Sequence, residues 1–128
     1  MGDPPQISHA TMSPRRFPVP RGTTFQYQLS KKAKVFFFLD RGARGRAVGG
    51  HCRRQSPQNR HHPSCPFYVR SGSFSQQGTQ GANMRYFDCR VSGRALKPAH
   101  YKVTIVAVDG MGNPSTPGKV LRFTVLRG

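Results

Sequence analysis

Acidic residues are nearly absent from this sequence. The only acids among its 128 residues are Asp3, Asp40, Asp88 and Asp109, against 21 Lys and Arg, which gives a formal net charge of +17. General acid–base catalysis and carboxylate metal sites need acidic side chains in positioned pairs, and four scattered acids offer few such pairs. We therefore expect no enzymatic activity, no catalytic residues, no metal and no cofactor, and we expect an anionic partner.

Long apolar runs are also missing. The longest, Val35–Leu39, is far shorter than the roughly 20 residues that a membrane-spanning helix needs. The N-terminal residues MGDPPQIS lack the basic start and the apolar stretch of a signal peptide. We expect no membrane span, and if the protein is exported we expect this chain to be a mature or excised piece of a longer one.

Helical periodicity is scarce, whereas alternation with a period of two recurs between Gly and Pro residues. This pattern predicts strands over 7–12, 24–29, 33–39, 67–74, 84–91, 101–108 and 120–125. Seven short strands predict an all-β fold, namely an immunoglobulin-like two-sheet β-sandwich with a long disulfide-closed loop, and a closed barrel is the rival architecture. We expect a linker with an edge strand over 1–20 and the sandwich domain over 21–128.

Residues 96–113 carry a recognisable pattern. Leu96, Pro98 and Tyr101 form L-x-P-x-x-Y, and the strand that follows ends in A-x-D-x-x-G-N at residues 107–113. We expect Tyr101 to enter the core with its hydroxyl bonded to backbone, and Asp109 and Asn113 to supply turn chemistry rather than a calcium site.

This pattern resembles the last hairpin of bacterial immunoglobulin-like and fibronectin type III-like repeats. The order of motifs from Gly22 to Tyr101 is similar to an Arg-rich branch of these repeats found in exported actinobacterial proteins. The resemblance implies an extracellular or cell-surface location and a role as a spacer or adhesion module of a larger exported protein. It supplies no catalytic residues.

The stretch HCRRQSPQNRHHPSC, residues 51–65, concentrates groups that bind metals or anions. Zinc could use Cys52, Cys65 and two histidines, but the wide cysteine spacing and the adjacent histidines differ from the usual close pairs. A Cys–His nucleophile would lack an orienting acid. A Cys52–Cys65 disulfide is favoured, because closing this loop contributes about 3 kcal/mol in the chain-entropy model. A pairing that involves Cys89 stays open; otherwise Cys89 is a buried free thiol.

Basic side chains cluster around the same connection. The candidate anion-binding residues are Arg44, Arg46, Arg53, Arg54, Arg60, His61 and His62. The main expectation is a non-enzymatic extracellular spacer or adhesion domain that contacts anionic cell-envelope polymers. The alternative is a basic nucleic-acid-binding domain that uses the Arg-rich connection over 41–60. A solvated basic surface that binds any polyanion weakly is a further possibility, and a small hydrolase-like enzyme ranks last.

Overall fold

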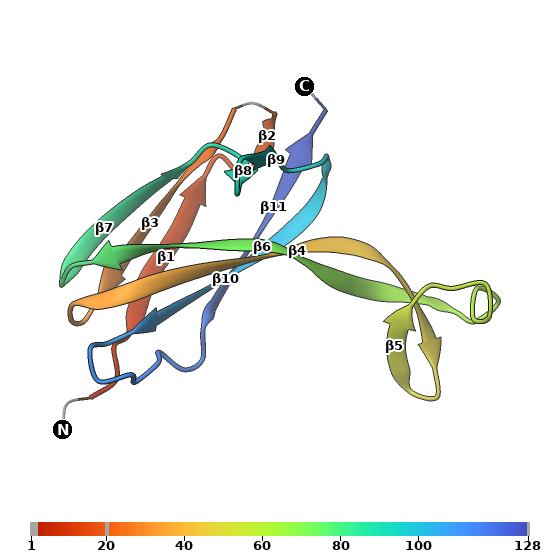
Figure 1. The fold of residues 1–128 in the computed structure, drawn as a ribbon, viewed down its shortest axis with the longest axis horizontal. Helices are drawn as coiled ribbons and strands as arrows, with labels where there is room; N and C mark the ends of the chain where they lie inside the picture. The colour runs from red at the N-terminus through yellow and green to blue at the C-terminus, as the bar shows by residue number, and fades with distance from the viewer. Residues whose placement is uncertain (1–2, 20, 128) are drawn as a thin grey trace.

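The computed structural model describes residues 3–19 and 21–127, and all of its regular elements are strands (Figure 1). They are β1 (Ile7–Ser13), β2 (Arg16–Pro18), β3 (Thr23–Leu29), β4 (Ala33–Val48), β5 (His51–Arg54), β6 (Ser64–Gly78), β7 (Gly81–Phe87), β8 (Arg90–Val91), β9 (Arg94–Ala95), β10 (Ala99–Val108) and β11 (Lys119–Leu126). The all-β prediction is therefore confirmed. The described residues contain no helix long and apolar enough to cross a membrane.

Two main sheets share one hydrophobic core. The smaller sheet has the order β1-β3-β7, and the larger has β2-β11-β10-β4-β5, with β6 also paired to β4; β8 and β9 pair separately. The segments nearest the N-terminus belong to this core as well, because Ile7, Met12 and Phe17 are buried in it.

Alternation with a period of two decides which side chains enter the core. On β3, Phe25, Tyr27 and Leu29 are buried while the glutamines between them are exposed. Aromatic rings from both sheets meet there, for example Phe25 and Phe37 at 5.2 Å between ring centroids, and Phe37 and Phe74 at 4.7 Å. Each aromatic side chain buries 150–250 Å², so this cluster is a principal source of the stability of the fold.

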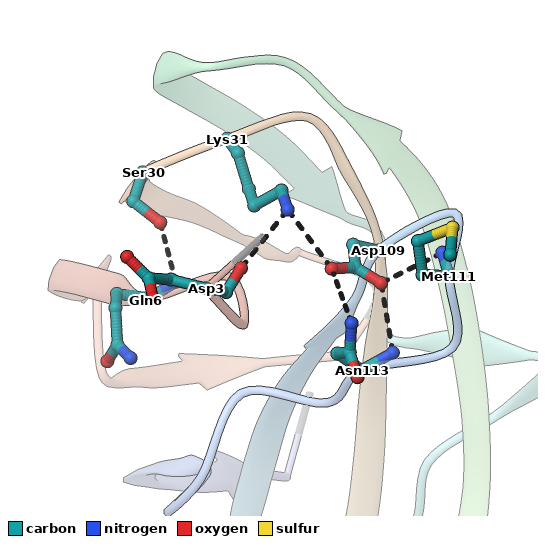
Figure 2. A network of polar contacts seen from close by, with 7 residues as sticks. All are labelled: Asp3, Gln6, Ser30, Lys31, Asp109, Met111 and Asn113. Atoms are coloured by element: carbon teal, nitrogen blue, oxygen red, sulfur yellow. Dashed lines mark hydrogen bonds and ion pairs between the residues drawn. The ribbon is translucent and has the colours of Figure 1, made fainter. Parts of the chain in front are cut away.

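The turn between β10 and β11 is fastened to the N-terminal segment by a polar network (Figure 2). Asp109 accepts hydrogen bonds from the backbone amides of Met111 and Asn113, both at 2.9 Å, and its carboxylate lies 3.1 Å from Lys31 Nζ. Lys31 also donates to the carbonyl of Asp3 at 3.1 Å. The predicted turn role of Asp109 and Asn113 is confirmed.

These contacts act on the acidity of Asp109. The backbone hydrogen bond from Asn113 lowers the pKa most, and burial opposes this effect by raising the pKa. The Lys31 ammonium, the Asn113 side-chain amide and the Met111 backbone amide lower the pKa further, and the result is a pKa of about 2. The buried Tyr101, also predicted, donates its hydroxyl to the carbonyl of Lys97 at 2.6 Å.

The strand predicted over 84–91 is interrupted. β7 ends at Phe87, and Cys89 has a φ of 69° in the turn before β8, a left-handed backbone conformation outside the β region. Cys89 is nevertheless fully buried and free, as expected, and burial raises the pKa of its thiol.

Candidate functional site

The segment expected to be a long polar loop is instead a β-structured arm. Arg41, opposite Tyr101, is the last β4 residue paired with β10; beyond it β4 and β6 leave the body as a hydrogen-bonded ribbon (Figure 1). We call residues 42–68 the arm. The β4 part of the arm has seven residues, so the strand extends about 23 Å beyond the sheet.

Sequence periodicity missed the arm for a physical reason. Neither face of the ribbon joins the core, so no apolar alternation marks it, while its backbone groups are satisfied by the ladder that runs from Asp40↔Arg70 to Arg46↔Ser64. β5 folds back on β4 and adds a third strand, with pairs from Gly45↔Arg54 to Val48↔His51.

A disulfide joins the two sides of the arm. Cys52 on β5 and Cys65 on β6 are bonded, as predicted, with their Cα atoms 6.0 Å apart. Gly45 on β4 makes room for this bond: a Cβ added there would lie 2.6 Å from Cys52 Sγ and 2.8 Å from Phe67 Cβ. Because both sulfurs are consumed, neither the zinc site nor the Cys–His nucleophile has a thiolate at these positions.

The loop at the tip of the arm is held by its own polar side chains. Arg46 donates from Nε to Gln55 Oε1 at 3.0 Å and from a guanidinium NH2 group to the carbonyl of His62 at 2.9 Å. Asn59 donates to the carbonyl of Arg54 at 3.0 Å and accepts from the amide of Ser56 at 2.8 Å. Arg46, predicted as an anion ligand, is thus a structural residue of the loop.

The other predicted arginines point to solvent. Arg44, Arg53, Arg54 and Arg60 are exposed, and the sequence of the arm contains no Asp or Glu. His61 is exposed and its ring lies 4.4 Å from that of the half-buried His62. The structure therefore gathers all seven predicted residues on one protruding element that carries no acidic side chain, and of the seven Arg46 is the one that holds the loop.

Other basic residues were not predicted as candidates. Lys102 and Arg122 lie on predicted strands that were interpreted for their core-facing side chains, and Arg16 lies outside the predicted strands. Arg16, Arg122 and Lys102 lie on the outer face of the larger sheet, between core positions such as Phe17 and Phe123. The same alternation that predicts the core also assigns these residues to the opposite face. Among the described residues no group of three or more His, Cys, Asp or Glu is placed to hold a metal ion.

No protein-family model matches this chain, and no curated protein matches it. Solved structures that it resembles include the Pseudomonas fluorescens alkylpurine DNA glycosylase AlkC bound to DNA containing an abasic site analog. That match has 14% sequence identity and a TM-score of 0.41, and it covers 98% of this chain and 31% of the glycosylase chain.

The main functional expectation, an extracellular spacer or adhesion module, was wrong. The finding that overturns it is this neighbour, a DNA-bound protein, which agrees with the alternative expectation and not with the main one. At a TM-score of 0.41 we take neither fold nor role from the neighbour, and the case for the alternative rests on the arm itself.

Proposed function

We propose that this chain is a nucleic-acid-binding domain whose basic arm contacts the phosphate backbone. The observation that carries the proposal is the combination of protrusion and charge: four exposed arginines and no acid on a ribbon that extends about 23 Å from the body. Arg makes bidentate hydrogen bonds to phosphate, and contacts of this kind supply affinity without reading sequence.

Rigidity supports the same proposal. The disulfide between Cys52 and Cys65 and the hydrogen bonds of Arg46 order the arm before any ligand arrives. A preordered surface loses less conformational entropy on binding than a flexible basic tail of equal charge. The arm is therefore more than a generic positive surface.

We also propose that the two sheets form an immunoglobulin-like β-sandwich and that the chain works in an oxidising compartment. The single core between the sheets and the Tyr101 hydroxyl bonded to backbone support the first, and the disulfide supports the second. In this proposal the anionic partner expected from the charge is nucleic acid, and the domain binds it without altering it.

Two charge-matched variants test the arm. The first replaces Arg44, Arg53, Arg54 and Arg60 by Ala; the second replaces the exposed body residues Arg21, Arg90, Arg94 and Arg127 by Ala. Both lower the formal net charge from +17 to +13. Fluorescence anisotropy with a labelled oligonucleotide, repeated at several salt concentrations, measures the dissociation constant and its salt dependence.

We expect the arm variant to weaken binding at least tenfold near physiological salt, and to reduce the slope of log K against log salt by about 3, since each lost phosphate contact removes about 0.7 to 0.9. The body variant should change both much less. Equal losses in the two variants would mean that only the overall charge matters, and the proposed function would then be abandoned.

A further inference from the structure

The outer face of the larger sheet carries basic residues in two neighbouring rows. Strand pairing aligns Arg16 with Thr124 and Thr124 with His100, and β4 aligns Gly42 with Tyr68. The next row holds Arg122 beside Lys102, then Asp40 and Arg70. At about 4.8 Å between strands, the first row crosses five strands and is about 19 Å long, and the second crosses four and is about 14 Å long. Both rows end on β6 at the root of the arm.

The first row is held in place by contacts centred on Thr124. Its amide donates to the carbonyl of Arg15 at 2.8 Å, which fixes the segment that carries Arg15 and Arg16. Its hydroxyl lies 2.9 Å from His100 Nδ1, which orients the imidazole ring. The sheet therefore positions the backbone that carries Arg16 and the imidazole ring of His100.

Two hollows flank this row and meet at its centre. One, of about 400 Å³, is lined by residues that include Arg16, Arg122, Thr124, Tyr68 and His100. The other, of about 530 Å³, is lined by residues that include Gly42, Arg44, Tyr68 and His100. Tyr68 and His100 border both hollows, which therefore adjoin at these residues. We call the two hollows together the groove, and their volumes suit small-ligand groups.

Gly42 packs closely against His100 at the middle of the groove. A Cβ at Gly42 would lie 3.1 Å from the carbonyl oxygen of His100, tighter than ordinary van der Waals contact. Beside it, the ammonium of Lys102 lies 4.2 Å from the centroid of the Tyr68 ring. An aromatic side chain therefore stands at the centre of the groove with basic side chains on both sides of it.

The electrostatics of the groove favour an anion. No Asp or Glu lines either hollow among the described residues, and the nearby Asp40 is paired with Arg70 at 2.6 Å. Arg16, Arg122 and Arg44 are exposed and line the groove from end to end. A basic channel that follows a backbone, with an aromatic side chain on which a base can stack, is the arrangement by which proteins hold single-stranded nucleic acid.

We propose that this groove binds a single strand of nucleic acid, with phosphates on Arg16, Arg122 and Arg44 and one base stacked on Tyr68. The inference rests on the proposed function and adds to it the form of nucleic acid that the domain recognises. A duplex keeps its bases stacked on one another and cannot present a base face to Tyr68, whereas a single strand can.

The experiment uses a 5′-phosphorylated tetrathymidylate, which is short enough to occupy the groove without engaging the tip of the arm. Its binding to the full chain is followed by chemical-shift changes of backbone amides and compared with that of inorganic tetraphosphate, an anion without bases. The variants are Tyr68→Leu and a matched control, Tyr86→Leu, which changes a 60% exposed tyrosine on the other sheet.

We expect the tetrathymidylate to shift the amide resonances of Tyr68, His100 and Thr124. Tyr68→Leu should weaken tetrathymidylate binding about tenfold, in line with the cost of removing a stacking aromatic. Tyr68→Leu should leave tetraphosphate binding unchanged, and Tyr86→Leu should change neither.

Equal affinities of Tyr68→Leu and the unmodified chain for the tetrathymidylate would overturn the groove proposal, as would shifts confined to other surfaces. That result would not affect the arm proposal, which depends on the four-arginine comparison with a longer oligonucleotide. If Tyr68→Leu lowered the melting temperature by more than the control does, Tyr68→Phe would replace it as the test. Tyr68→Phe keeps the stacking ring and should bind the tetrathymidylate like the unmodified chain. A tenfold loss of affinity in Tyr68→Phe would refute stacking.

Discussion

Replacing both cysteines of the arm, Cys52→Ser with Cys65→Ser, separates the stability of the arm from that of the body. The disulfide closes a loop whose ends are 13 residues apart, and the chain-entropy model gives about 3 kcal/mol for a loop of that size. None of the arm residues 42–68 belongs to the buried core. The loss should therefore fall on local opening of the arm and leave global unfolding nearly unchanged.

Hydrogen exchange of backbone amides measures both quantities at once. A loss of about 3 kcal/mol corresponds to exchange roughly 100-fold faster for arm amides such as Ala47, which donates to the carbonyl of Pro63 at 2.8 Å. Amides of β10 in the core should keep their rates, and the thermal midpoint should move by no more than a few degrees. A large drop in the thermal midpoint with unchanged arm exchange would refute this reasoning, because it would mean that arm and body unfold as one unit.

Three further predictions follow from particular contacts. Gly45→Ala should loosen the arm in the same exchange measurement, because its Cβ meets Cys52 Sγ and Phe67, whereas Gly110→Ala, with open space around it, should not. The pKa of Asp109 is lowered to about 2, below its ordinary 3.8, so its contribution to stability is present above about pH 4 to 5 and is lost as the pH falls toward 2. Asp109→Asn should therefore flatten this part of the curve of unfolding free energy against pH, measured by urea unfolding. The control variant Asp3→Asn should leave the curve as it is. Phe37→Ala should cost about 3 to 5 kcal/mol of unfolding free energy, and the half-exposed Phe36→Ala clearly less; equal costs would contradict the assignment of strand faces.

The core-forming strands could be predicted because burial leaves a period-two pattern in the sequence. Leu121, Phe123 and Val125 alternate with polar residues, and their strand was placed within one residue of its observed ends, 119–126. The disulfide could be predicted for a related reason, since a polar segment that cannot pack a core needs another constraint. Both are local properties of the chain.

The arm and the groove could not be predicted from such patterns. Beyond Leu39 the ladder between β4 and β6 continues through residues with no preferred buried face, so its hydrogen bonds leave no mark on side-chain choice. The groove depends on pairing between strands far apart in the sequence, for example Arg16 on β2 with Thr124 on β11. Only the assembled sheet brings Arg16, His100 and Tyr68 to one face.

The pairing of β4 with β6 also constrains how this protein can vary. The arm is an extension of a hairpin that already belongs to the sheet, so its reach can change without any change in the core. Removing or adding two residues on each strand would preserve which side chains face which way, whereas a change of one residue would turn every later side chain over. Homologous arms should therefore differ in length by even steps per strand, with the glycine beneath the disulfide moving in step with the cysteines.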